Sequence, residues 1–258
     1  MNLKRLLSNI FWGTMSTKEN IEKYQEKIRK VEWDAIASYI PFSSSFLDVG
    51  CGAGFSLIKA KHEKKCLVTG VDPAPGEHGV GRFTNDLWKE RPILKAAAED
   101  LPFESNSFDV VYSSHVLEHV DSESKTLAEM SRVLKSEGKL IIGMPTASMA
   151  WLAFFSHFLF TTHINLLFLC KAFKYRDFKE RLSLLFIPRS HSYPNAKYIY
   201  YDLKHYRISN WKKIISQEFE IQHVLLPAFY PFPDYIQFFR LRKHFILSSS
   251  VFFICSKK

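Results

Sequence analysis

Short apolar runs, separated by turn-forming residues, recur along this chain. The runs at residues 46–49, 67–71, 219–226 and 245–254 predict strands. Residues 55–61 and 209–216 are instead compatible with helices, and Ser209 is suited to cap the second of them. The pattern therefore predicts a chain that mixes strands with helices.

The first apolar run ends in three glycines at alternate positions, Gly50, Gly52 and Gly54. Because glycine has no Cβ atom, its backbone lets a ligand approach closely, and the free N–H groups of the helix that follows favour a negative or strongly polar group. A dinucleotide site requires G-x-G-x-x-G, but Phe55 stands where the third glycine would be. We therefore expect a ligand site of another kind at this turn.

Residues 46–55, with Asp48 two positions before the first glycine, resemble the first motif of the class I S-adenosylmethionine-dependent methyltransferases. Later segments resemble, in the family's order, the motifs of its ubiquinone-methyltransferase-like branch, methyltransferase type 11: 67–72, 98–103, 107–112, 115–120 and 132–142. The resemblance is strong over residues 30–143 and weak at 205–207 and 219–221. It departs from the family at Ala97, where an Asp is common.

This resemblance implies an α/β fold with a Rossmann-like, doubly wound sheet of seven strands, mostly parallel with an antiparallel last strand. A helical, aromatic-rich insertion would follow the fifth strand. We accordingly divide the chain into an N-terminal helical segment, 1–40, and a methyltransferase domain, 41–258, whose insertion or cap covers about 145–205.

The resemblance also implies S-adenosyl-L-methionine as the cofactor. The glycine turn would cradle its methionine part with Asp48 nearby, Asp72 would accept both ribose hydroxyls, and the chain around Ala98 would meet the adenine. The full predicted cofactor set is Asp48, Gly50, Cys51, Gly52, Gly54, Asp72, Ala98, Glu99, Ser114 and His115.

Methyl transfer from a sulfonium is a single displacement in which the protein supplies alignment and electrostatics. An acceptor oxygen with a high pKa also needs a general base. His115 is the leading candidate, because it follows the fourth strand, where ligands bind in open α/β sheets. His205 is the second, although it could instead cap a helix or pair with a carboxylate.

Weaker candidates are Glu118, His119, His191, Tyr193 and Arg207. The sequence shows no metal-binding cluster, and the four cysteines, Cys51, Cys66, Cys170 and Cys255, are scattered without paired or metal-ligand spacing. No metal is therefore expected unless the acceptor is a catechol-like chelate. Unpaired cysteines suit a reducing cytoplasm, and residues 3–11 are too short and too polar to predict a signal peptide.

Charge and aromatic residues divide the chain into two unlike halves. Residues 1–143 carry 19 Lys and Arg against 20 Asp and Glu, whereas residues 144–258 carry 16 against 6. Of the 23 Phe, 16 lie in the second half. The two halves are therefore expected to face different partners.

A stretch free of charged residues, 140–170, leads into a basic segment, 171–181. Three structures fit its aromatic part, 147–170: a helical cap over the active site, an element lying in a membrane interface, or a membrane span. Length permits a span, but polar residues near its middle, including His157 and His163, make one costly. Basic residues beside an aromatic segment match an anionic lipid surface.

These observations favour a methyltransferase that acts on a hydrophobic or lipid-linked small molecule, in the cytoplasm and peripherally at the inner face of the membrane. A soluble methyltransferase for a small acidic or sugar metabolite is one alternative, and a catalytically inactive binding protein that retains the fold is another. A nicotinamide reductase is disfavoured by the missing third glycine, and nucleic acid by the lack of a binding motif.

Overall fold

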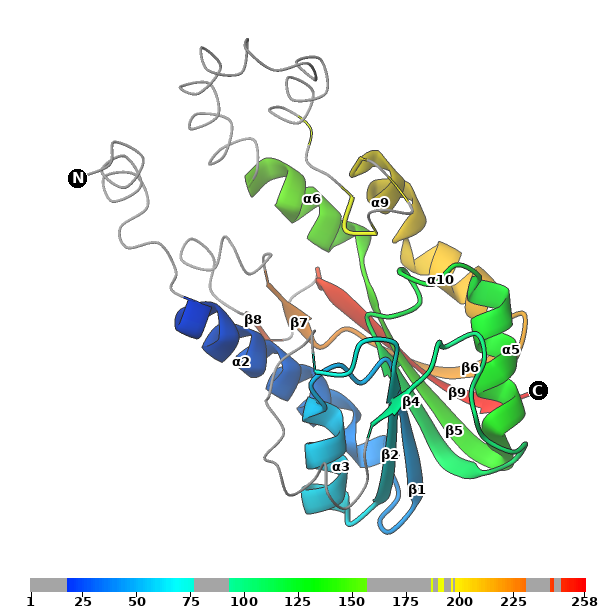
Figure 1. Cartoon of the computed structure of the whole chain (residues 1–258). Coiled ribbons are helices and arrows are strands. Elements are labelled where there is room, and N and C mark those ends of the chain that lie inside the picture. The colour runs from blue at the N-terminus through cyan, green and yellow to red at the C-terminus, as the bar shows by residue number, and fades with distance from the viewer. Residues whose placement is uncertain are drawn as a thin grey trace.

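A computed structural model of the chain describes residues 18–76, 93–156, 187, 190–192, 196, 198–230, 242–243 and 247–258. Its centre is a seven-stranded sheet of order β3-β2-β1-β4-β5-β9-β6 (Figure 1). The strands are β1 (Ser45–Val49), β2 (Leu67–Asp72), β3 (Leu94–Lys95), β4 (Phe108–Ser114), β5 (Leu134–Pro145), β6 (Phe219–Leu225) and β9 (Ser250–Lys257). Two short strands, β7 (Ala228–Phe229) and β8 (Arg242–Lys243), pair separately.

Parallel pairing joins β3, β2, β1, β4 and β5, and β9 is antiparallel to both of its neighbours, β5 and β6. The predicted mixed sheet with an antiparallel last strand is confirmed. Strand order reverses between β1 and β4, because β2 and β3 lie on one side of β1 and β5 lies beyond β4. In such sheets, ligands bind at the carboxyl ends of the strands beside this reversal.

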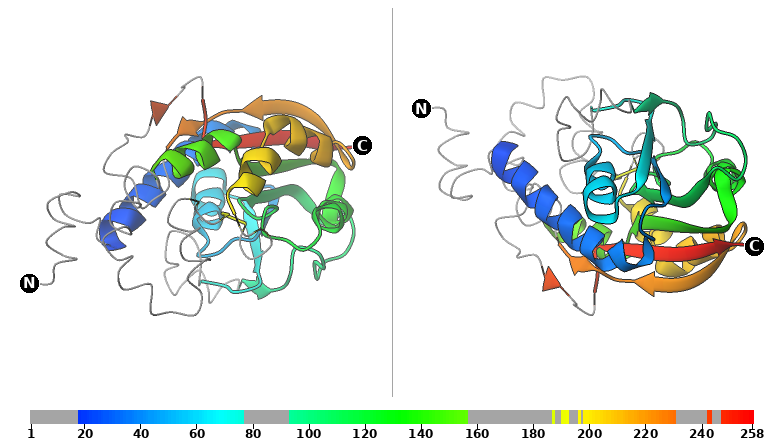
Figure 2. Two further views of the ribbon diagram at one scale, coloured as in Figure 1. Left: turned by 90° about the horizontal axis from the view of Figure 1, so that it is seen from above. Right: turned by 90° about the horizontal axis from the view of Figure 1, so that it is seen from below.

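Alternate residues of each central strand enter two different cores. Phe46 and Phe252 belong to one cluster, and their chain neighbours Leu47 and Phe253 belong to the other. Because successive side chains of a strand point to opposite faces, both faces must be covered. Figure 2 shows the covering helices on the two sides of the sheet: α2 (Lys18–Ile36), η1 (Ala37–Tyr39), α3 (Phe55–Lys64), α5 (Glu123–Val133), α6 (Ala147–Ser156), α9 (Tyr200–His205) and α10 (Ile208–Ile215).

Helix α2 is built into the core beside β1 and β4. Trp33 is 2% exposed, packs edge-on against Phe46 and Tyr112, and donates its indole N–H to Glu63 Oε2 over 2.7 Å. This anchor fixes the helix on the sheet, so that the polar residue Arg29, one turn earlier, reaches the carboxyl ends of the strands.

In the second half, α10 packs through Trp211, whose indole N–H donates to the Pro145 carbonyl at the end of β5 over 2.9 Å. The predicted cap at Ser209 is wrong. Arg207 has extended backbone angles and holds the N-cap position without a side-chain hydrogen bond, so the helix begins one residue before Ser209. Nearby, the Asn210 amide donates to the His205 carbonyl and joins α10 to α9.

Several predicted segments lie outside the described residues: the N-terminal helix at 3–11, most of the loop at 73–92, and residues 157–186 of the insertion. Of the insertion's aromatic part, α6 is described. Within the described ranges, none of the helices combines the length and hydropathy that a bilayer crossing requires.

Candidate active site

The glycine turn between β1 and α3 is in the left-handed backbone region at all three glycines, with φ of 75° at Gly50, 50° at Gly52 and 82° at Gly54. Gly50 is also constrained by space, because a Cβ atom there would lie 2.2 Å from Cγ2 of Val116. The N–H groups of Gly50 and Cys51 both donate to the Val71 carbonyl, over 2.8 and 3.1 Å. The turn is thereby tied to the end of β2.

Two buried carboxylates flank this turn. Asp72, the last residue of β2, accepts hydrogen bonds from the Gly52 N–H through Oδ2 over 2.7 Å and from the Ala74 N–H through Oδ1 over 2.8 Å. Asp48 in β1 accepts a hydrogen bond from the Ser56 hydroxyl. Burial, reinforced by the charge of Asp72, raises the pKa of Asp48 to about 7 despite that hydrogen bond. The site therefore favours a positively charged ligand group beside these carboxylates.

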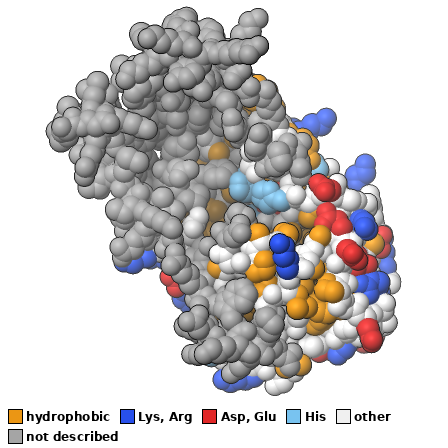
Figure 3. All heavy atoms as spheres, viewed as in Figure 1, with side chains coloured by type: hydrophobic (Ala, Val, Ile, Leu, Met, Phe, Trp, Pro, Cys, Tyr) orange, Lys and Arg blue, Asp and Glu red, His pale blue; other side chains and the backbone are white. Residues whose placement is uncertain are grey.

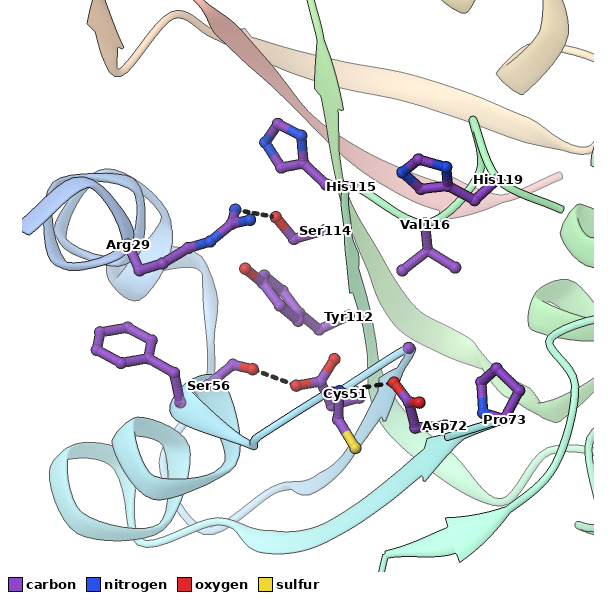
Figure 4. A pocket seen from close by; sticks show the side chains of 14 residues that line it. Arg29, Cys51, Ser56, Asp72, Pro73, Tyr112, Ser114, His115, Val116 and His119 are labelled. Carbon is purple, nitrogen blue, oxygen red and sulfur yellow. Dashed lines mark hydrogen bonds between the residues drawn. The ribbon is translucent and has the colours of Figure 1, made fainter. Parts of the chain in front are cut away.

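A cavity of about 600 Å³ opens over the turn. In Figure 4, Arg29 from α2 and His115 from the end of β4 lie across the cavity from Asp72 at the end of β2. Apolar side chains, including Phe55 and Val116, complete its wall. Three different strands and two helices, α2 and α3, thus contribute to a single binding space at the strand-order reversal.

Most of the predicted cofactor residues meet in this cavity. Those that line it are Asp48, Gly50, Cys51, Gly52, Asp72, Ser114 and His115. Gly54 is instead the N-cap of α3, Ala98 is buried in the core, and Glu99 accepts a hydrogen bond from the Asp121 N–H over 2.9 Å. The adenine-side assignments to Ala98 and Glu99 remain predictions.

A buried ionic network that the sequence did not reveal forms the wall opposite the glycine turn. The Arg29 guanidinium donates to Glu32 Oε2 over 2.9 Å and to the Ser114 hydroxyl over 3.2 Å, and the Tyr230 hydroxyl donates to Glu32 Oε1 over 2.7 Å. Although burial opposes ionisation, Arg29 and His115 lower the pKa of Glu32 to about 2. The network links α2, the end of β4 and the segment after β7.

His115 has an unusual backbone, with φ of 57°, which places its ring between two carboxylates. Nε2 lies 3.7 Å from Glu32 Oε1, and Nδ1 lies 3.5 Å from Glu118 Oε1. Burial and Arg29 act to lower the pKa of His115, but the two carboxylates outweigh them and raise it. The imidazole also lines the cavity, and this electrostatic environment favours a cation at the same point.

His205 is placed in a different setting, between α9 and α5. Its Nε2 lies 2.6 Å from Glu123 Oε1, its ring stacks on Tyr201, and it packs edge-on against Trp211. It does not line the cavity described above. The sequence left open that His205 pairs with a carboxylate instead of acting in catalysis. The structure shows this pairing, with Glu123.

Comparison with known proteins gives a match to the methyltransferase-domain family over residues 47–142. The sterol 4-C-methyltransferase strm-1 of Caenorhabditis elegans is 35% identical over 99 residues, which are 37% of this chain and 29% of that protein. The ubiquinone/menaquinone biosynthesis C-methyltransferase UbiE of Campylobacter jejuni is 30% identical over 110 residues, which are 40% of this chain and 46% of that protein. The tRNA U34 carboxymethyltransferase of Aeromonas hydrophila is 31% identical over 117 residues, which are 43% of this chain and 35% of that protein. The matched parts are less than half of each curated relative.

Solved structures extend the likeness to the whole fold. An S-adenosylmethionine-dependent methyltransferase from Thermotoga maritima, described as a possible histamine N-methyltransferase, has a TM-score of 0.55 at 18% identity. The match covers 92% of this chain and 91% of that chain. A methyltransferase of the same cofactor class from Listeria monocytogenes has a TM-score of 0.52 at 18% identity, with 89% and 99% covered. At these identities, the likeness shows a shared fold.

Proposed function

We propose that this chain, whose residues 47–142 form a methyltransferase domain of the class I S-adenosylmethionine-dependent family, transfers a methyl group to a hydrophobic or lipid-linked small molecule. The observation that carries the proposal is the pairing of Gly52 N–H with Asp72 in the cavity at the strand-order reversal. That hydrogen bond holds the glycine turn and the Asp72 carboxylate together at the place where this family binds its cofactor.

The residues present fit S-adenosylmethionine. Gly50 and Gly52 both have positive φ, so the turn presents backbone without a side chain at these positions, and each Asp72 oxygen that accepts a backbone N–H retains a second lone pair for a ribose hydroxyl. Asp48 adds a buried carboxylate that a cationic ligand would hold in its ionised form. When bound, the cofactor supplies an electrophilic methyl group on a sulfonium.

The chain's own contribution to the reaction is alignment and charge. The Arg29–Glu32 pair fixes Ser114, and the two carboxylates around His115 fix its ring, so the wall facing the glycine turn is preorganised. His115 is the group placed to accept a proton from an acceptor hydroxyl or to donate a hydrogen bond to its oxygen. Asp48 and Asp72 supply negative charge on the opposite side.

A hydrophobic acceptor is supported by the surface that follows β5. Trp151 and Phe155 of α6 are 48% and 53% exposed, and their rings stack at 5.7 Å. Tyr200 and Tyr201 of the adjacent helix α9 are also exposed. An aromatic surface of this kind is suited to an apolar substrate or a lipid interface. Relatives named for sterol and quinone methylation point the same way.

Methyl transfer can be tested with radiolabelled S-adenosylmethionine and two substrate pools, a total lipid extract and an aqueous metabolite extract. We expect label in the organic phase, lost at least 100-fold in Asp72→Ala and retained in the surface control Asp34→Ala. Label confined to the aqueous phase would contradict a hydrophobic acceptor and favour the acidic or sugar metabolite. Cofactor binding without transfer to either pool would favour the inactive binding protein.

A peripheral membrane position in the cytoplasm rests on the basic segment 171–181 beside the aromatic residues of the insertion. Cys51, Cys66 and Cys255 are free thiols, as suits a reducing compartment. Flotation with anionic vesicles should carry the protein upward at low salt and less so at high salt. Protein that stays at the bottom of the gradient at every salt concentration would remove the membrane position and leave the enzyme.

A further inference from the structure

Glu118 is buried without the partners that a buried carboxylate needs. The residue is 4% exposed, and neither carboxylate oxygen has a hydrogen-bond partner in the described part of the chain. Its Oε1 lies 3.5 Å from Nδ1 of His115 and 3.9 Å from Nε2 of His119. His115 Nε2 is likewise buried without a hydrogen bond. The nearby imidazoles offset the charge of Glu118, but a buried polar atom without a hydrogen bond still destabilises a fold unless something else satisfies it.

A third ligand-type side chain, His191, completes the cluster. One ligand atom from each of His115, Glu118 and His191 lies within 4.8 Å of the other two. Ligand atoms around one tetrahedral ion with bonds of about 2.1 Å are about 3.4 Å apart, so a small inward rotation of the side chains brings them into range. Figure 3 shows histidine side chains gathered at the middle of this face of the molecule.

His191 is held in place from outside the cluster. Its backbone N–H donates to Asp202 Oδ2 over 2.7 Å, and the hydroxyl of Ser190 donates to the same carboxylate. The ring packs edge-on against His119 at 5.1 Å.

We propose that His115, Glu118 and His191 form a binding site for one divalent transition-metal ion. Two imidazoles and one carboxylate are a ligand set typical of Zn²⁺ and also suited to Mn²⁺, Fe²⁺ and Co²⁺. A cation between these side chains satisfies the Glu118 carboxylate and accounts for a buried carboxylate at this position. It also joins the loop after β4 to the segment 190–192, which are far apart in the sequence.

The site adjoins the methyl-transfer cavity, because His115 belongs to both. Three protein ligands leave coordination positions open for water or for a substrate oxygen. Resting on the proposed function, this implies an acceptor that presents an oxygen, which the metal would orient and acidify beside the cofactor pocket. In the metal-bound protein the ion would thus take over the role in deprotonation that His115 would have in the metal-free protein. The metal site itself does not depend on that role.

The test is direct metal binding by the full-length chain after treatment with a chelator. Co²⁺, whose visible absorption reports its coordination, is titrated first and then displaced by Zn²⁺. We expect one ion per chain, with Zn²⁺ bound at a Kd below about 1 µM, and at least tenfold weaker binding in Glu118→Gln and in His191→Ala. The matched controls Glu104→Gln and His62→Ala replace exposed residues and should bind as the wild type does.

A second measurement separates a metal site from a metal-free ion pair. Without metal, Glu118→Gln should melt at the same or a higher temperature than the wild type, because it removes a buried charge, and Zn²⁺ should stabilise only the wild type. A Kd above about 1 mM, or binding unchanged in both ligand variants, would overturn the proposal, as would a metal-free Glu118→Gln protein that melts well below the wild type. Cofactor binding by the metal-free protein tests the proposed function separately.

Discussion

Asp48 is a buried residue whose charge state should change within the physiological pH range. Its pKa is about 7 in the folded chain, against 3.8 for an ordinary Asp. The folded state therefore holds the Asp48 proton more tightly than the unfolded state does, so the contribution of Asp48 to stability falls as pH rises from about 4 to about 7 and is level above. This loss of stability at higher pH follows because an ionised carboxylate is buried in the absence of a cationic ligand.

Replacing Asp48 by Asn should remove this pH dependence. In the absence of cofactor at pH 8, the variant should be more stable than the wild type by about 1–3 kcal/mol, and at pH 4 the two should be similar. Urea unfolding at the two pH values measures the difference. A variant that is less stable by the same amount at both values would show that the Asp48 carboxylate is not buried in this way.

Gly50 is constrained by both its backbone angle and its space. Gly50→Ala should lower the free energy of unfolding by about 2 kcal/mol or more, because φ is 75° and the new Cβ atom meets Val116. Adding Val116→Ala should recover about 1 kcal/mol of that loss, since it removes the clash and leaves the strained angle. Val116→Ala alone is the control, and additive losses in the double variant would contradict the contact.

Local motif spacing predicted the residues of the glycine turn, Asp72 and His115, because these lie within a few positions of a strand end. Arg29 and Tyr230 carried no such signal, since only the packing of α2 brings Arg29 to the cavity and only the segment after β7 brings Tyr230 to Glu32. His191 was a weak candidate for the same reason: its approach to Glu118 is a tertiary contact.

Among the elements, α9 and α5 are joined by His205 and Glu123. The pair is partly exposed, with side-chain exposures of 18% and 26%, so it contributes modestly to stability. His205→Ala should lower the free energy of unfolding by about 1–2 kcal/mol, mostly through lost packing on Trp211 and the lost hydrogen bond. Denaturant unfolding and cofactor titration together test this.

The same variant distinguishes a structural His205 from a catalytic one. A structural residue predicts methyl transfer within about threefold of the wild type at temperatures where the variant is folded. Loss of 100-fold or more in kcat with unchanged stability would instead support the catalytic role that the sequence suggested.

The apolar runs predicted the positions of most strands, but boundaries depended on pairing partners. β5 begins at Leu134, several residues before its apolar run, because Leu134 pairs with Phe108 at the start of β4. The start of α10 likewise depended on the extended backbone of Arg207 and was missed at Ser209. Hydrophobic periodicity does not encode either contact.

For the molecule as a whole, the sheet depends on its last strand. β9 lies between β5 and β6, and Val251 to Cys255 are fully buried. A chain that ends at residue 249 should therefore fail to fold cooperatively, because both neighbours lose their partner and two cores lose a wall. Near-UV circular dichroism and limited proteolysis report this, with deletion of Lys258 alone as the control. A cooperative native transition in the truncated chain would contradict the central place of β9.

Family motifs predicted the sheet topology as well, since each motif marks a strand end in a fixed order. The family motifs did not predict how residues 144–258 pack near the site. The charge and aromatic content of that half indicate what kind of partner it could bind and do not indicate its packing.

Calorimetric titration of S-adenosylmethionine into the purified chain tests the central claim most directly. We predict one binding site with a micromolar Kd, weakened at least 100-fold in Asp72→Ala and changed less than twofold in Asp34→Ala. The absence of binding at millimolar cofactor, or binding undiminished in Asp72→Ala, would contradict a methyltransferase site at the glycine turn.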